Sequence, residues 1–457
     1  MNFLNAQVGG TNAPSRFATL QAMSWESTFS IDHYQGRTAD WSHPPNGHYY
    51  SNKAPGPMFL AFPLTWLMDR VETFFEPKTN EQFFPGEMYK AIVCLVTQMI
   101  PYAITALIVS HLLESLGVSW LAGQYVIVAM LFGNTASVFM NSFFGHGVAA
   151  WLLVCVFLSL YYRRYFWVGM SYGLACLSDY GAITLLPGFL VSLWLNRKER
   201  SEKSADHLKD FQKLILGATL PAILWIWYHT SCFGSPFTLP QKFQSPEFVE
   251  PASSQTSQIW GALSFLPKWE YAYELLVGRS RGILDTQPWF YIAALGGIAL
   301  TFKKKLIILS SKITASRIPA PLLSLTLLGF PFLFDMNASF NGWHGGHSAG
   351  PRYLCIIFPL FAILAGFVYD ASNKWTRRLL WVTLGAAITL RVLIYLGWLT
   401  VPVIPIWKSY FSILLEFKFR PWFKAVLCTI GFIVTARYTR LEHQRSTGPS
   451  RPETCAL

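Results

Sequence analysis

The sequence is poor in charged side chains, and this shortage excludes more classes of protein than any motif does. Only 13% of its 457 residues are Asp, Glu, Lys or Arg, whereas about one quarter of a soluble chain is charged. Apolar residues make up 52% of the chain and aromatic residues 16%, and the mean hydropathy is +0.33. Such a chain is too apolar to be disordered or to hide its aromatic residues from water. We therefore expect an all-α polytopic membrane protein.

Several familiar site patterns are also lacking. The sequence has no zinc-type spacing of Cys and His, no Walker motif and no dinucleotide-binding glycine pattern. Its cysteines lie mostly inside apolar stretches, so they indicate no disulfide framework. No cofactor is predicted, and the need for a divalent metal stays open because His344 and His347 alone are a small ligand set. The net charge of +12 is typical of cytoplasmic Lys and Arg in a membrane protein, so no nucleic-acid partner is expected.

Apolar runs of the length of a membrane span, about 20 residues, recur along the chain. Residues 166–196 form a longer run that Asp179-Tyr180 interrupts, which predicts two half-helices with Asp179 between them, shielded by protein. The stretch 57–68 is too short to span and contains two prolines, so we expect a re-entrant or interfacial helix there. Together with the clear runs, these features predict a bundle of about 9–11 transmembrane helices. The clear runs lie at about 91–113, 118–140, 147–162, 214–230, 288–302, 318–335, 353–369, 379–398 and 421–436.

The basic clusters predict the orientation of this bundle. They fall on one side of the membrane if the spans alternate, and that side is then cytoplasmic. The clusters are Arg163-Arg164, 197–213, 303–305, Arg377-Arg378 and 437–451. We expect a multi-pass protein of a cell membrane, the bacterial inner membrane being the simplest choice, with its active side facing outward.

This orientation also divides the chain. Residues 1–57 become an outer loop, 58–437 the transmembrane bundle with further outer loops at about 231–287 and 336–352, and 438–457 a disordered cytoplasmic tail. Residues 1–10 are too few for a signal peptide or a first span. We therefore expect either an absent preceding helix or export of the first loop without one.

The loop 1–57 has the highest density in the chain of side chains that are suited to catalysis or ligand binding. It holds two carboxylates suited to general-base work, Asp32 and Asp40, near His48, Tyr49 and Lys53. Lys and Arg side chains are suited to binding phosphate. The alternative is a solvated loop whose polar groups only satisfy one another.

Two further clusters lie in the other outer loops. Residues 341–353 contain four glycines, which allow close backbone approach, and Arg352 begins the next span. Residues 278–283 place Arg281 on the outer side against the charge rule, which favours an anionic ligand. An anchoring turn explains the first cluster equally well, and an ion pair with a nearby carboxylate explains the second. Within the membrane, His146 and Asp179 are expected to face the bundle or a water-filled cavity, with a structural hydrogen bond favoured over catalysis.

Eight segments of the chain, in order from about residue 12 to 360, carry a resemblance. They are SRFATLQAM, TFSIDHYQGRTADW, NGHYYSNKAPGP, FFGHG, SDYGA, FGSPF, GRSRGI and GWHGGHSAGPRYL. In these segments the chain resembles bacterial membrane glycosyltransferases of the C-type superfamily, which are related to protein O-mannosyltransferases and to the lipid A aminoarabinose transferase. The resemblance implies a multi-helix fold with an outward-facing site under the first loop. It also implies a polyprenyl-phosphate sugar donor, an acidic base for inverting attack at the anomeric carbon, and basic residues that hold the departing phosphate.

One position departs from the family pattern. The family usually has an acidic residue three positions before the arginine of the SRFA segment, and this position is Ala13 here. We therefore assign the base to Asp40, ahead of Asp32, because Asp40 lies closer to the HYYSNK segment. On this basis we assign phosphate binding to Lys53, Arg281 and Arg352, and then to Arg16, and contacts with the donor sugar to His48, Tyr49, His344 and His347.

The expected function is transfer of a sugar from polyprenyl phosphate to a lipid, glycan or protein acceptor at the outer face of the membrane. Two other classes stay open. A transporter or flippase should show two similar halves, and the sequence has no internal repeat. A non-catalytic subunit that keeps the fold is favoured by Ala13 and by the absent helix.

Overall fold

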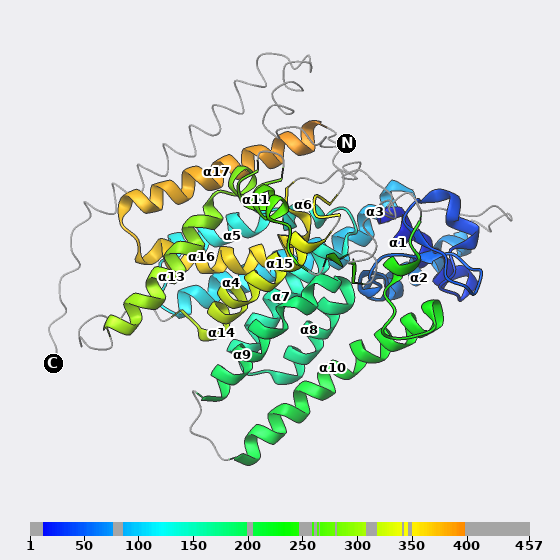
Figure 1. The fold of residues 1–457 in the computed structure, drawn as a ribbon, viewed down its shortest axis with the longest axis horizontal. Helices are drawn as coiled ribbons and strands as arrows, with labels where there is room; N and C mark the ends of the chain where they lie inside the picture. Colours follow the sequence, from blue (N-terminus) through cyan, green and yellow to red (C-terminus); the bar gives the residue numbers. More distant parts are fainter. Residues whose placement is uncertain are drawn as a thin grey trace. The chain divides into compact units, whose positions relative to one another are not determined.

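The apolar runs of the sequence form helices in the computed structural model shown in Figure 1. The structure describes residues 12–75, 86–198, 204–245, 258–259, 263–264, 266–278, 281–307, 318–340, 342–345 and 350–397. All of these residues belong to one unit of the chain, Met1–Ile406. The span expected at 421–436, the tail 438–457 and His347 lie outside the described residues.

Helices dominate the described residues, and the strands are two short hairpins. The antiparallel hairpins are β1 (Trp41–Ser42) with β2 (Tyr50–Ser51), and β3 (Gln258–Ile259) with β4 (Leu263–Ser264). The α-helices are α1 (Asn12–Gln21), α2 (Gly56–Phe75), α3 (Glu87–Cys94), α4 (Ile100–Ser115), α5 (Trp120–Leu131), α6 (Ala136–Phe139), α7 (Gly145–Tyr161), α8 (Tyr165–Ser178), α9 (Leu186–Lys198), α10 (Ser204–Phe233), α11 (Trp269–Val277), α12 (Ile283–Thr286), α13 (Trp289–Ile307), α14 (Ala320–Leu323), α15 (Gly329–Ser339), α16 (Phe358–Ala371) and α17 (Lys374–Gly397). Helical turns of π or 3-10 type lie at Ala22–Glu26, Asp32–Arg37, Leu95–Met99, Tyr180–Leu185, Pro240–Phe243, Ser324–Leu328 and Arg352–Ile357.

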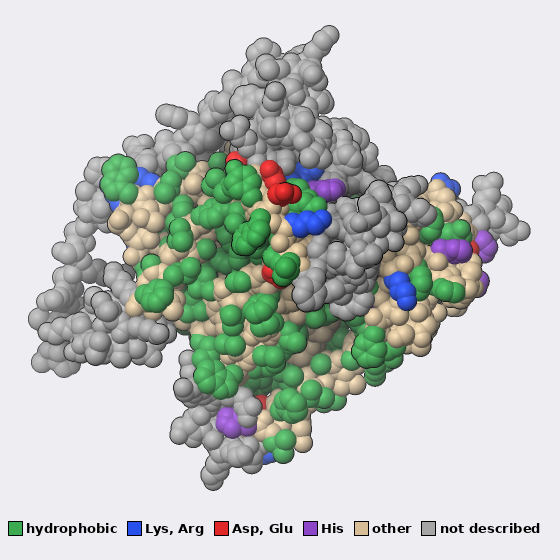
Figure 2. Space-filling view, in the orientation of Figure 1, with side chains coloured by type: hydrophobic (Ala, Val, Ile, Leu, Met, Phe, Trp, Pro, Cys, Tyr) green, Lys and Arg blue, Asp and Glu red, His purple; other side chains and the backbone are tan. Residues whose placement is uncertain are grey.

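Among the described residues, four helical segments are long and apolar enough to cross a membrane. They are Met88–Ser115, His207–Phe233, Ala320–Ser339 and Arg352–Ala371. Shorter apolar helices accompany them at Trp120–Leu131, Gly145–Tyr161, Tyr180–Asn196 and Trp289–Phe302. Figure 2 shows hydrophobic side chains spread over much of the visible helical surface, a distribution that fits lipid better than water. The chain is a mostly helical protein with candidate membrane spans, as its composition predicts.

Helix α16 lies at the centre of the described bundle. In its segment Arg352–Ala371, 89% of the most apolar stretch is buried, against 17% of the corresponding stretch in α10. Helices α5, α7 and α13 pack against α16, and α10 runs along α8 (Figure 1). The outer face of α10 exposes large apolar side chains, among them Leu216, Ile223 and Trp227. An apolar face of this kind is suited to contact with lipid.

The apolar stretch 166–196 breaks at Asp179, and this prediction is confirmed. Helix α8 ends at Ser178, Asp179 is extended with φ −148°, and the turn Tyr180–Leu185 leads into α9. The Asp179 carboxylate accepts a hydrogen bond from the Gly181 N–H at 2.9 Å, so it caps the second half-helix. Asp179 is only 9% exposed, which means that protein shields it.

Two predictions about helix boundaries are wrong. The span expected at 118–140 ends at Leu131 and resumes at Ala136. The Asn134 amide donates to the carbonyls of Ala129 at 2.8 Å and Met130 at 2.6 Å, and these bonds satisfy the last carbonyls of α5. The helix expected at 57–68 extends over 20 residues as α2, and Pro63 lies inside it without ending it.

The described parts of the loops that the sequence places outside are folded. The hairpin β1–β2 is attached to a segment 198 residues later, because the Ser42 hydroxyl donates to the Pro240 carbonyl at 2.7 Å. The His43 N–H also donates to the Phe243 carbonyl at 2.8 Å, and the Ser245 N–H to the Trp41 carbonyl at 3.0 Å. These bonds hold the hairpin, and the residues that follow it, in a defined place beside the bundle.

Glycines set the distance between α8 and α10, and they generate the first testable prediction. A Cβ atom at Gly217 would lie 1.9 Å from the Phe166 carbonyl oxygen. We predict that Gly217→Ala pushes the helices apart and costs about 1–3 kcal/mol, seen as a lower melting temperature of the purified protein in detergent. Gly385→Ala is the matched control, because a Cβ atom there meets nothing within 4 Å. Equal effects of the two substitutions would contradict the close packing.

Candidate functional site

Helix α1 carries polar side chains into the interior. Ser15, Arg16, Thr19 and Gln21 are all buried, and Arg16 is only 4% exposed. One nitrogen of the Arg16 guanidinium donates to the Asn12 side chain, one helical turn earlier. A buried guanidinium is costly unless neighbouring groups offset its desolvation, so the surroundings of Arg16 define the site.

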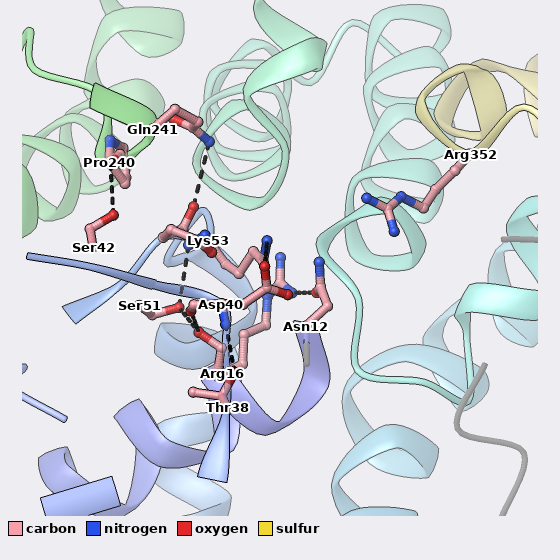
Figure 3. Close-up of polar contacts among 12 residues, drawn as sticks. Asn12, Arg16, Thr38, Asp40, Ser42, Ser51, Lys53, Pro240, Gln241 and Arg352 are labelled. Carbon is pink, nitrogen blue, oxygen red and sulfur yellow. Dashed lines mark hydrogen bonds and ion pairs between the residues drawn. The ribbon is translucent and has the colours of Figure 1, made fainter. Parts of the chain in front are cut away.

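Asp40 and Lys53 form a largely buried ion pair beside Arg16 (Figure 3). Lys53 Nζ lies 2.9 Å from Asp40 Oδ1, and the two side chains are 18% and 10% exposed. The Ser15 hydroxyl donates to the Asp40 carbonyl at 2.6 Å and lies 2.7 Å from the Ser51 hydroxyl. Helix α1 and the hairpin therefore hold Asp40 and Lys53 from two sides.

Arg352, at the start of the segment that leads into α16, points toward Asn12 and Arg16 in Figure 3. Its guanidinium lies over the Phe144 ring at 5.7 Å and the Tyr353 ring at 4.8 Å, and it donates to the Tyr353 hydroxyl at 2.8 Å. The Nε atoms of Arg352 and Arg16 are buried without a hydrogen-bond partner. Within the described part of the chain, neither guanidinium forms an ion pair with a carboxylate.

The electrostatics of this group are dominated by excess positive charge. Burial lowers the pKa of Arg16 to about 10, although Asp40 and Asp179 raise it. Burial also lowers the pKa of Lys53, against the effect of Asp40, and the charges of Arg352 and Arg16 lower it further. Arg16, Lys53 and Arg352, which we call the cation cluster, outnumber the two carboxylates beside them. An anion bound among these side chains would offset the excess.

The structure places Asp32, His48 and Tyr49 in a different group, on the surface of the loop that follows α1. Asp32 accepts from the Tyr49 N–H at 2.6 Å and pairs with His48 Nδ1 at 2.6 Å, and the two side chains of that pair are 39% and 56% exposed. Burial raises the pKa of Asp32, but the hydrogen bonds from Tyr49 and His48 outweigh it and the pKa is lowered overall. Of the two carboxylates assigned as base, only Asp40 adjoins the cation cluster.

Arg281 and His344 form a third group, which links two of the predicted clusters. Arg281 is 1% exposed, and its Nε donates to the His344 carbonyl at 3.1 Å. The neighbouring Trp343 ring stacks on Tyr271 with ring centroids 5.1 Å apart. The GRSRGI and GWHGGHSAGPRYL segments therefore meet in space, 63 residues apart in the chain.

Sequence reasoning missed one pairing in this region. His146 and Asp179 contact each other directly, through His146 Nδ1 and Asp179 Oδ2. The sequence predicts that each residue is a polar group inside the bundle. It does not predict that the two contact each other, because they lie on different elements. The signal that could have found them is their position beside the breaks of two apolar helices.

The Asp40–Lys53 pair generates the second prediction. Asp40→Asn or Lys53→Met alone leaves a buried group without its charged partner, which costs about 3–5 kcal/mol. The double substitution should lower the melting temperature by less than the sum of the two single effects. The measurement is a thermal melt of the four proteins in one detergent. Strictly additive losses would show that the two charges do not depend on each other.

The site consists of charged and hydrogen-bonding side chains of this chain. In the parts of the chain that the structure describes, no group of three or more His, Cys, Asp or Glu side chains is placed to hold a metal ion. No family model matches the chain, and no curated protein or solved structure matches it either.

Proposed function

We propose that this chain is an integral membrane glycosyltransferase that moves a sugar from a polyprenyl-phosphate donor to an acceptor at the outer face of the membrane. The reaction class comes from the resemblance of its eight segments to C-type membrane glycosyltransferases. The observation that carries the proposal is the cation cluster, in which the Nε atoms of Arg16 and Arg352 are buried without a hydrogen-bond partner. Such a cluster suits the phosphate of a lipid-linked donor.

Phosphate fits these side chains for a chemical reason. Its oxygens accept several hydrogen bonds at once, and a guanidinium presents its N–H groups in a fixed planar fork that matches them. When the bond between the anomeric carbon and the phosphate oxygen breaks, the lipid phosphate leaves with the electron pair and gains negative charge. Fixed cations shielded from water stabilise that charge more strongly than mobile water does.

Asp40 has a defined part in this proposal. It holds the Lys53 ammonium group at 2.9 Å, so the position of one phosphate-binding cation depends on it. Asp40 is thus needed whichever group takes the proton of the acceptor. Asp32, bound to His48 and Tyr49 on the exposed loop, is assigned no part in the chemistry.

A second candidate function is binding of lipid phosphate without turnover, by a subunit that keeps the fold. The position where the family usually has its acid is Ala13, which is buried at 5% exposure. One oxygen of Asp40, the nearest substitute, is already used by Lys53. These two observations favour a subunit that binds the donor but does not transfer its sugar.

The cation cluster generates the third prediction, which needs no knowledge of the sugar. Undecaprenyl phosphate should bind the purified chain, and undecaprenol, which lacks the phosphate, should bind much more weakly. Arg16→Gln and Arg352→Gln should each weaken phosphate binding about 10–100-fold, because each removes a charge-assisted hydrogen bond of about 1.5–3 kcal/mol. Arg70→Gln is the matched control, since Arg70 lies over the Trp25 and Trp66 rings at 5.9 and 5.5 Å, outside the cluster. Equal binding of the two lipids would refute the phosphate site.

The transfer reaction generates the fourth prediction. Membranes that contain the chain are given a panel of radiolabelled undecaprenyl-phosphate sugars, and label in the acceptor fraction is counted. Asp40→Asn should lower transfer about 100-fold, a loss typical of a displaced catalytic group, whereas Asp32→Asn should leave it near the level of the unaltered chain. A loss confined to Asp32→Asn would move the chemistry to the exposed loop. Phosphate binding without transfer of any sugar would favour the second candidate.

A further inference from the structure

The His146–Asp179 pair borders the cation cluster and takes no part in the contacts assigned to phosphate. His146 lies in the first turn of α7, and Asp179 at the break after α8. Each residue is 9% exposed, and they are 33 residues apart in the chain. A histidine and a carboxylate buried together beside a candidate reaction site are a common arrangement for proton transfer.

The contacts of Asp179 determine which nitrogen of His146 carries the proton. One carboxylate oxygen accepts from the Gly181 N–H at 2.9 Å, and the other meets His146 Nδ1. An ionised carboxylate only accepts hydrogen bonds, so Nδ1 must donate. Neutral His146 then carries its proton on Nδ1 and its free lone pair on Nε2.

His146 Nε2 is open, although the residue is mostly buried. It makes no hydrogen bond with the residues that the structure describes. It is also not one of the fully buried polar atoms that lack a hydrogen-bond partner. The imidazole lies edge-on to the Tyr353 ring, with centroids 5.5 Å apart, and Tyr353 binds Arg352 through its hydroxyl. A Cβ atom at Gly145 would lie 3.1 Å from a terminal nitrogen of Arg16, so that guanidinium reaches the start of α7. Two members of the cation cluster thus flank the imidazole.

We propose that His146 is the proton acceptor of the transfer reaction and that Asp179 is its positioning residue, an inference that rests on the proposed function. The acceptor hydroxyl gives its proton to His146 Nε2 while its oxygen forms the bond to the anomeric carbon. The bond from that carbon to the phosphate oxygen breaks, and its electron pair leaves with polyprenyl phosphate. The imidazolium formed is stabilised by Asp179 until it releases the proton to water.

This assignment replaces Asp40 as the base for a structural reason. Protonation of Asp40 at either oxygen would remove the negative charge that holds Lys53 Nζ at 2.9 Å, and a phosphate-binding cation would lose its ionic partner during the step. His146 has no such conflict, because its Nε2 binds none of the described residues and its Nδ1 is already held by a carboxylate. The two roles, holding the cation and taking the proton, then belong to different residues.

Two variants test the assignment through a split between binding and rate. His146→Gln and Asp179→Asn should each lower transfer about 100-fold. His146→Gln should leave the affinity for undecaprenyl phosphate near that of the unaltered chain, and Asp179→Asn, which removes a negative charge beside the cation cluster, should not weaken it. Arg352→Gln should instead lose affinity. Transfer at the unaltered rate in His146→Gln would overturn the proposal. Absence of undecaprenyl phosphate binding to the unaltered chain is a different result, and it would defeat the proposed function itself.

Chemical modification of histidines tests the role of His146 if a variant fails to fold or no sugar is transferred. Diethylpyrocarbonate acylates unprotonated imidazole, and mass spectrometry locates the modified histidines in the unaltered chain. His146 should be modified, and undecaprenyl phosphate should protect it, whereas His48, with its side chain 56% exposed, should be modified in both samples. Failure to modify His146 in the folded chain, or modification that bound undecaprenyl phosphate does not reduce, would overturn the proposal.

Discussion

The buried guanidinium of Arg16 is the constraint on which the arrangement of the loops and helix ends around it depends. A charge that is 4% exposed must have its desolvation offset by neighbours that the fold brings to it. Asp40 and Asp179 do so, since both raise the pKa of Arg16 against the effect of burial. They come from the loop before β1 and from the break after α8, so parts of the chain far apart in sequence meet around one charge.

Close backbone approach makes this convergence possible. A Cβ atom at Gly56 would lie 2.3 Å from the Ser178 hydroxyl, and one at Gly145 would lie 2.0 Å from the Ser178 carbonyl oxygen. The starts of α2 and α7 therefore rest directly on the end of α8, and any larger residue would separate them. The segments NGHYYSNKAPGP, FFGHG and SDYGA therefore meet at this one serine. Gly56 and Gly145 allow this close approach, which brings the elements that carry Arg16, His146 and Asp179 near one another.

The features that could be predicted from the sequence are those that depend on a single stretch of the chain or on its composition. The break at Asp179 follows from one carboxylate in a long apolar run, and the helical class follows from composition. The end of α5 at Leu131 could not be predicted, because Asn134 is an ordinary polar residue until its amide is found on the carbonyls of Ala129 and Met130. Pairs across different elements have no periodic signature. The contact of His146 with Asp179, and the separation of Asp40 from Asp32, therefore needed the fold.

The contrast between Asp32 and Asp40 shows that burial, rather than residue type, determines which charged groups are suited to the proposed chemistry. Both carboxylates pair with a side chain that can be cationic, at 2.6 Å and 2.9 Å. The Asp32–His48 pair is exposed, so water screens it and reorganises freely around any new charge. The cation cluster lies where water is largely excluded, and its charges are held in place before a ligand arrives. Charge that develops on a departing phosphate is stabilised by such fixed groups without the cost of reorganising them, which an exposed pair cannot provide.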